Sequence, residues 1–238
     1  MTCEWQVELD EFCRKVLAKH WPDVRRWDDI KTFPPTGPID EWRVDLLAGG
    51  FPCQPVSHAG KREGEHDQQG RWLWPEMFRV CKLLRPRWVL VENVLGLLSA
   101  GDVRGSLFGG ILRDLASIGY CVEWHCLSAG GPEGFSGPHR RRRIWIIAHP
   151  GIERIPGLVP GKNPGGDGSW QWRGKEDLCN ISSTPTKRGD RWPQPIIRRV
   201  DDGTSSRVDR LRAIGNAVAV PVVEVIGRSI MEAERSPE

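Results

Sequence analysis

Short apolar runs alternate with longer amphipathic stretches over the first 150 residues, and this alternation constrains the fold more than any other feature. The strand-like runs are EWQVEL, RVDLLA, WVLVENV, CVEWHCLSA and RRRIWIIAH. Strands that alternate with helices build α/β proteins, whose sheets are mainly parallel. The pattern therefore predicts a Rossmann-like, doubly wound, mostly parallel sheet.

Three helices are predicted, two of them with clear boundary signals. Asp10 is a suitable N-cap for EFCRKVLAKHW, which breaks at Pro22. Pro75 lies in the first turn of WPEMFRVCKLLRP, and Arg85-Pro86 ends that helix before WVLVENV. A further helix covers LFGGILRDLASIG. Each helix thus lies between two predicted strands.

Composition limits the class of protein. The chain has 238 residues, 39% of them apolar and 27% charged, which suits one sizeable α/β domain. No segment reaches the ~20 apolar residues that span a bilayer. Seven cysteines without a CxxC pair predict neither a disulfide framework nor a metal site. We expect a cytoplasmic protein whose net charge of +3 permits a polyanionic partner.

Composition also divides the chain. Residues 1–150 form the predicted α/β domain. Residues 151–197 are rich in Gly, Pro and polar residues, which indicates either a small recognition region or a disordered surface excursion. Residues 198–238 regain helical character, interrupted at Pro221, and we expect them to pack back on the first domain.

Cys53 follows the strand-like run RVDLLA on a glycine-bearing turn, GGFPCQPVS. Open α/β sheets bind ligands at the carboxyl ends of their strands, so a thiol at this position could be a nucleophile. A free cysteine is more often a small buried hydrophobic residue. The polar segment 57–71 that follows predicts a mobile loop.

Glu92 lies near the carboxyl end of WVLVENV, at the same predicted sheet edge as Cys53. A carboxyl in partly apolar surroundings has a raised pKa and can donate a proton, although Glu92 could instead cap the next turn. Arg141 and Arg143 of HRRRR alternate, so they share a face of an incipient strand. They could clamp an anion or a carbonyl oxygen, or form a solvated basic edge.

The blocks GGFPCQPVS, VENV, HRRRRIW and RLRAIGNAV resemble, in order and spacing, the signature blocks of the cytosine-5 DNA methyltransferases. The resemblance runs from about Trp5 to Ile226. It implies a fold of the S-adenosylmethionine-dependent methyltransferase type, with Cys53 as the thiolate that attacks C6 of a flipped cytosine. Glu92 would hold or deliver a proton at cytosine N3. Arg143, with Arg141, would bind the O2 side of the base or support the catalytic loop.

The resemblance also implies the binding residues. Gln54, Ser57 and Asn93 would contact the substrate base. The residues that would hold S-adenosylmethionine are Glu8 at the ribose, Asp29 and Ile30 at the adenine, and Pro52, Asn216 and Val218 around the pocket. Duplex DNA would be the substrate, and the family's setting implies a cognate restriction endonuclease.

One block of the family is missing. The glycine loop that holds such a cofactor lies roughly 20 residues before the ribose-binding acid, and counting back from Glu8 passes Met1. We expect the chain to lack the first strand and to be poorly stable or inactive, unless a second polypeptide supplies that segment. The alternatives are an inactive nucleic-acid-binding remnant, a tRNA cytosine-5 methyltransferase, and a thiol hydrolase that uses Cys53 and His58.

Overall fold

The computed structural model describes residues 1–34, 37–52, 72–101, 103–130, 141–150 and 216–235. Cys53, Gln54 and Ser57 lie outside the described residues, as do the predicted loop 57–71 and the region 151–197.

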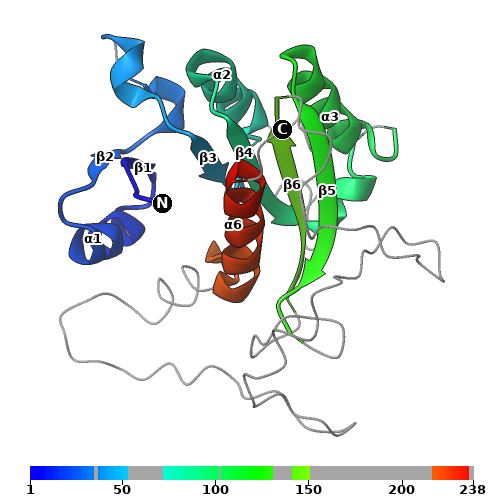
Figure 1. Cartoon of the computed structure of the whole chain (residues 1–238). Coiled ribbons are helices and arrows are strands. Elements are labelled where there is room, and N and C mark those ends of the chain that lie inside the picture. Colours follow the sequence, from blue (N-terminus) through cyan, green and yellow to red (C-terminus); the bar gives the residue numbers. More distant parts are fainter. Residues whose placement is uncertain (35–36, 53–71, 102, 131–140, 151–215, 236–238) are drawn as a thin grey trace, which may run out of the picture.

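The larger sheet has the strand order β3-β4-β6-β5 (Figure 1). These strands are β3 (Leu46–Gly49), β4 (Trp88–Val94), β5 (Cys121–Ser128) and β6 (Arg142–His149). β3 and β4 are parallel, whereas β6 is antiparallel to both of its neighbours. Three strands therefore share one direction and only β6 opposes them. Because β6 lies between β4 and β5, the sheet is mixed, with one parallel and two antiparallel ladders. The α/β class is confirmed.

The reversed direction of β6 has a local cause. The β5–β6 ladder continues to Ala129, whose N–H donates to the carbonyl of Arg141 at 2.9 Å. Only residues 130–140 separate the two ends of this ladder. A crossover that returns a strand in the parallel sense needs a dozen or more residues and usually a helix.

The N-terminal segment forms a separate small sheet. β1 (Trp5–Val7) pairs in parallel with β2 (Arg25–Trp27), and α1 (Glu11–His20) connects them. Within the described residues, this pair shares no strand ladder with the larger sheet. The Trp5 indole links the two, because its Nε1–H donates to the carbonyl of Trp42 at 3.0 Å.

Helices cover both faces of the larger sheet. α2 (Trp74–Leu84) and α3 (Ser106–Ser117) contribute Val80, Leu84 and Ile111 to the core on one face. α6 (Val220–Arg235) covers the other face, where Ile226 packs with Trp145 (Figure 1). Short 3₁₀ turns, Ile30–Thr32, Ile39–Trp42 and Leu95–Ser99, connect these elements.

Local signals set the helix ends. The Asp10 carboxylate accepts a hydrogen bond from the Cys13 N–H, so it is the predicted N-cap. Pro75 lies in the first turn of α2, and Arg85 leaves that helix with a left-handed φ of 51° before Pro86. Pro221 does not interrupt a helix as predicted. It lies in the first turn of α6, where the absent N–H has no helical partner to lose.

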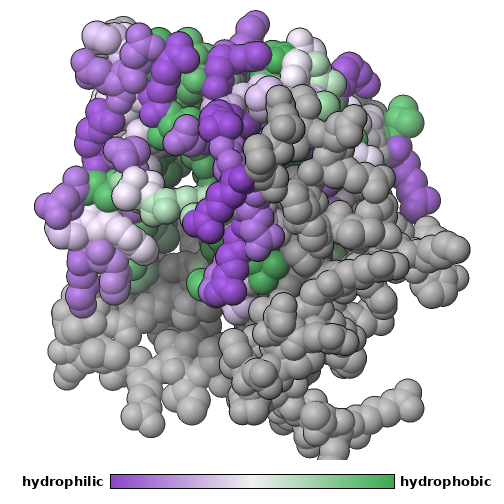
Figure 2. All heavy atoms as spheres, in the orientation of Figure 1, coloured by the Kyte–Doolittle hydropathy of each residue, from purple (hydrophilic) through white to green (hydrophobic). Residues whose placement is uncertain are grey.

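The surface of the described part is mostly polar. Hydrophilic side chains dominate the face shown in Figure 2, with smaller apolar areas between them. No helix in the described ranges is both long enough and apolar enough to cross a membrane.

Candidate active site

The candidate site lies at the carboxyl ends of β3 and β4. These strands are parallel and in register, with Gly49 opposite Val91, so the exit of β3 runs past Glu92. Gly50 lies so close that a Cβ there would be 3.3 Å from both the carbonyl oxygen and Oε2 of Glu92. A side chain at Gly50 would therefore crowd the carboxylate. Beyond Gly50 the chain passes through exposed Pro52 toward Cys53.

Asn93 ties the exit of β3 to β4. The side chain is only 2% exposed. Its Nδ2 donates to the carbonyl of Phe51 at 3.3 Å, and its Oδ1 accepts from the N–H of Val94 at 2.8 Å. Because the Phe51 carbonyl lies two residues before Cys53, Asn93 fixes the start of the segment that carries the thiol. Both contacts are to backbone groups, one in the segment after β3 and one on β4.

Glu92 forms a largely buried ion-pair cluster with two arginines, one just before β6 and one at its start. Its Oε1 lies 3.0 Å from Nε of Arg143 and 3.8 Å from Nη2 of Arg141. The side chains of Glu92, Arg141 and Arg143 are 12%, 14% and 21% exposed. The antiparallel register, Val94 opposite Arg143, brings both guanidinium groups to the carboxylate. This confirms that the two arginines share a face.

Burial raises the pKa of Glu92, although the positive charges of Arg143 and Arg141 act in the opposite direction. The loss of hydration is the larger influence. A carboxyl with a raised pKa holds its proton to higher pH and can donate it to a bound base. The same arginines orient the group, since both approach the same carboxylate oxygen.

Two acidic residues follow the ends of the small sheet. Glu8 follows β1, and its N–H donates to the carbonyl of Trp27 at the end of β2. Glu8 Oε1 accepts from the N–H of Asp10 at 2.8 Å, and Asp29 Oδ1 accepts from the N–H of Lys31 at 2.9 Å. The other carboxylate oxygen of Glu8, Oε2, is not used by this hydrogen bond to Asp10.

The structure does not bring all the predicted site residues close together. Glu92, Asn93, Arg141 and Arg143 lie together beside the exit of β3, and Ile30 and Asp29 lie together after β2. Asn216 and Val218 precede α6 and are exposed, and among the described residues neither forms a hydrogen bond with Glu8 or Asp29.

Two features of the site escaped the sequence analysis. The contact of Gly50 with Glu92 depends on the register of β3 and β4. The only signal for it in the sequence was the pair Gly49-Gly50. Arg79 of α2 donates to the carbonyls of Ile30 and Phe33 at 2.6 and 2.7 Å. Nothing in the amphipathic pattern of α2 distinguishes Arg79 from an ordinary surface cation.

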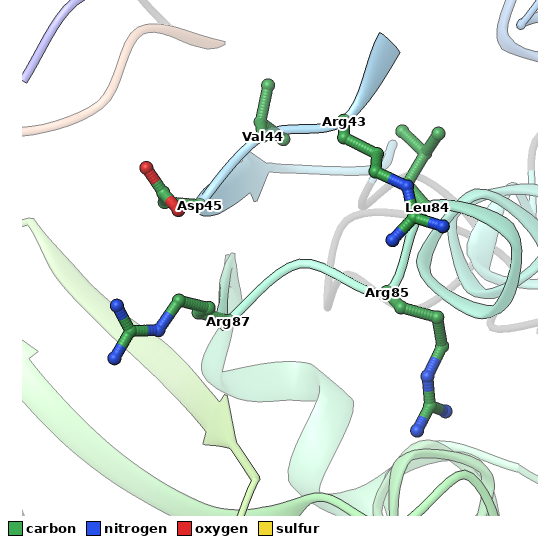
Figure 3. Close-up of a pocket in the computed structure, with 6 residues that line it drawn as sticks. All are labelled: Arg43, Val44, Asp45, Leu84, Arg85 and Arg87. Carbon is green, nitrogen blue, oxygen red and sulfur yellow. The ribbon is translucent and has the colours of Figure 1, made fainter. Parts of the chain in front are cut away.

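A pocket of about 270 Å³ lies at the opposite edge of the sheet, beside the residues that precede β3 and β4. Its lining includes three arginines, Arg43, Arg85 and Arg87, but Arg85 and Arg87 point away from each other (Figure 3). Arg87 pairs with Glu234 at 2.7 Å and Arg43 with Asp40 at 2.6 Å. The charges of Arg87 and Arg43 are therefore balanced, while Arg85 donates to the carbonyl of Ile118. This pocket is separate from the candidate site.

Comparison with solved structures agrees with the α/β fold described above. A solved structure described as a putative DNA modification methyltransferase encoded within an E. coli prophage aligns with a TM-score of 0.51. The alignment covers 67% of this chain and 44% of that protein, at 18% sequence identity. At this identity the likeness shows the fold alone, which is the α/β methyltransferase fold.

Sequence comparisons cover the same part of the chain. The type II methyltransferase M.BsuFI of Bacillus subtilis is 38% identical over 166 residues, which is 68% of this chain and 37% of that protein. M.DsaV of Dactylococcopsis salina is 32% identical over 148 residues, or 61% and 38% of the two chains. The chain thus spans under two fifths of the length of these relatives. The family model for the C-5 cytosine-specific DNA methylases matches residues 1–158, and the chain belongs to that family.

Proposed function

We propose that this chain carries the catalytic machinery of a DNA (cytosine-5-)-methyltransferase, which transfers a methyl group from S-adenosylmethionine to C5 of a cytosine in duplex DNA. One observation carries the proposal. A buried, protonatable carboxyl, that of Glu92, lies against the strand exit that leads to Cys53 and is held by two arginines. A nucleophile beside a proton donor is the pair that addition to an electron-poor ring requires.

The chemistry begins at Cys53. Its thiolate forms a bond to C6 of the cytosine, while Glu92 donates a proton to N3, so that the electrons of the C5–C6 double bond become available at C5. S-adenosylmethionine supplies, when bound, a methyl group on positively charged sulfur. Glu8, Asp29 and Ile30 would hold this cofactor, which would supply the methyl group that C5 receives and would leave as the neutral thioether. A base then removes the C5 proton, the C6–S bond to Cys53 breaks, and N3 returns its proton to Glu92, which restores the aromatic ring.

The remaining residues bind and position the reactants. Arg143 and Arg141 hold Glu92 and face the O2 side of the base, while Asn93 holds the segment that leads to Cys53. We assign Gln54 and Ser57 to the flipped base, which must leave the duplex to be reached. Glu8 would accept from the ribose hydroxyls.

The other cofactor contacts complete the proposal. Asp29 and Ile30 would contact the adenine, and Pro52, Asn216 and Val218 would surround the cofactor. In this proposal residues 1–150 catalyse the reaction and residues 151–197 contact the DNA bases. Residues 198–238 support the pocket, and a cognate restriction endonuclease acts on the same DNA.

Transfer of tritium from S-adenosyl[methyl-³H]methionine to duplex DNA tests the function. With the family's glycine-loop segment supplied as a second polypeptide, we expect the full chain to label cytosine in DNA, Cys53→Ser to abolish labelling, and Glu92→Gln to slow it roughly 10²-fold or more. Cys121→Ser is the matched control, because Cys121 is an exposed thiol on β5. It should label DNA at the unmodified rate.

The same assay distinguishes the alternatives. Labelling of tRNA in place of DNA would favour the RNA methyltransferase. A folded chain that binds DNA without any transfer would favour the inactive remnant. DNA with 5-fluorocytosine adds a chemical readout, because fluorine at C5 cannot leave as a proton and the adduct with Cys53 persists. Absence of that adduct in an otherwise active chain would refute the role of Cys53.

A further inference from the structure

Arg79 of α2 bridges two parts of the fold that no strand ladder connects among the described residues. Its Nη2 donates to the carbonyl oxygens of Ile30 at 2.6 Å and Phe33 at 2.7 Å. Its Nε pairs with Oε2 of Glu76, one turn earlier on the same helix, at 2.7 Å. One guanidinium therefore joins a helix of the larger sheet to the segment that follows β2.

The segment that Arg79 binds is a short turn with both ends fixed. Asp29 caps the 3₁₀ turn Ile30–Thr32 by accepting from the N–H of Lys31. Phe33, which follows the turn, is fully buried in the core of the larger sheet. Its ring lies 4.6 Å from that of Trp5 on β1, measured between centroids. Arg79 thus holds the start and the end of the turn against α2.

This bridge lies between the two halves of the candidate site. The cofactor residues Glu8 and Asp29 follow strands of the small sheet, whereas Glu92 belongs to the larger one. Methyl transfer requires the two reacting carbons to approach within about 3–3.5 Å, and a misplacement of about 1 Å can slow a reaction roughly 10²-fold. Contacts between the sheets must therefore set that distance.

We propose that Arg79 is a positioning residue that holds the adenine-binding segment 29–33 in place relative to the base-binding edge of the larger sheet. The inference rests on the proposed function, because it concerns the cofactor of that reaction. A planar guanidinium can serve Glu76 and two carbonyls at once, whereas a lysine ammonium reaches fewer acceptors in fixed geometry. Arg79→Lys should therefore restore only part of the effect.

Two readouts on the full chain test this role. The first is the dissociation constant of S-adenosylhomocysteine by calorimetry, at least 10 °C below each variant's melting temperature. The second is amide hydrogen exchange of peptides that cover residues 27–33 and 142–149. Arg79→Met removes the guanidinium, and Lys82→Met is the matched control, since it removes one exposed positive charge from the same helix.

For Arg79→Met we expect roughly tenfold weaker binding of S-adenosylhomocysteine and faster exchange in residues 27–33, because two charge-assisted hydrogen bonds are lost. Exchange in residues 142–149 should not change, and Lys82→Met should behave like the unmodified chain in both readouts. Arg79→Lys should fall between them, and it decides the question if Arg79→Met does not fold.

Three results would separate the possibilities. Equal dissociation constants for Arg79→Met and Lys82→Met would overturn the positioning role, even if the melting temperature of Arg79→Met is lower. Unchanged exchange in residues 27–33 would also overturn it, because the segment would then not depend on Arg79. Failure of the unmodified chain to bind S-adenosylhomocysteine would refute the proposed cofactor instead, while the exchange comparison would still decide whether Arg79 holds the segment.

Discussion

Removal of Arg143 should destabilise the protein in a pH-dependent way, because Glu92 would remain buried with a weaker partner. At an effective dielectric constant of about 20, an ion pair at 3.0 Å has a gross attraction of about 5.5 kcal/mol, and one at 3.8 Å about 4.4 kcal/mol. The net effect is smaller, since the ions lose hydration. Breaking a buried pair typically costs about 3–5 kcal/mol.

For Arg143→Met we expect a loss of about 3 kcal/mol in the free energy of unfolding near neutral pH, at the lower end of that range because Arg143 is 21% exposed. Arg141→Met should cost less, because its guanidinium lies farther from the carboxylate. A typical domain is stable by only about 5–15 kcal/mol, so the loss is readily measured.

The pH dependence follows from the pKa of Glu92, which burial already raises in the intact protein. Removing Arg143 removes the largest influence that lowers this pKa, so the pKa should rise further. A group whose pKa is raised in the folded state stabilises the fold fully at pH values below its pKa in the unfolded chain. This stabilisation is lost as the pH rises through its pKa in the folded protein. The deficit of Arg143→Met should therefore be largest at about pH 8 and shrink toward about pH 5.

Urea unfolding followed by tryptophan fluorescence measures this deficit at both pH values, and comparison at equal pH cancels the titration of other groups. Arg142→Met is the matched control, since Arg142 is the exposed neighbour on β6 and its loss should change stability by no more than about 0.5 kcal/mol. The double variant Arg143→Met/Glu92→Gln should recover part of the loss. A deficit that does not depend on pH, or a double variant no more stable than Arg143→Met, would refute the reasoning.

Three further substitutions test the packing around the site. Gly50→Ala places a methyl 3.3 Å from two oxygens of Glu92, so methyl transfer should slow about threefold to tenfold while unfolding changes little; an unchanged rate would contradict the contact. Asn93→Ala leaves the Phe51 carbonyl without its side-chain donor and should cost about 2 kcal/mol in urea unfolding and reduce methyl transfer. Ile226→Ala, in the fully buried face of α6, should cost about 2–5 kcal/mol, whereas the partly exposed Met231→Ala should cost far less.

Much of the local structure could be predicted because its causes lie within a few residues. Asp10 caps α1 through a hydrogen bond to Cys13, three residues ahead, and Pro75 starts α2 because its missing N–H loses nothing there. The shared face of Arg141 and Arg143 follows from the two-residue period of a strand. The exit of β3 beside Glu92 follows from the parallel neighbours of an α/β sheet.

What could not be predicted depends on partners far apart in the sequence. The place of β6 between β4 and β5 is decided by which strand edges meet. Pro221 was misjudged because the same residue can interrupt a helix or begin one.

The amino-acid sequence by itself determined the α/β class, the helix ends, the family and the residues able to carry the chemistry, because each depends on residue type and short spacing. Only the tertiary structure decided how strongly Glu92 is buried, that Arg143 lies nearer to it than Arg141, and that Arg79 reaches Ile30 across 49 residues. The physical reason is that burial and ion pairing depend on distances in space, and a backbone carbonyl that accepts from a distant arginine has no signature in the sequence.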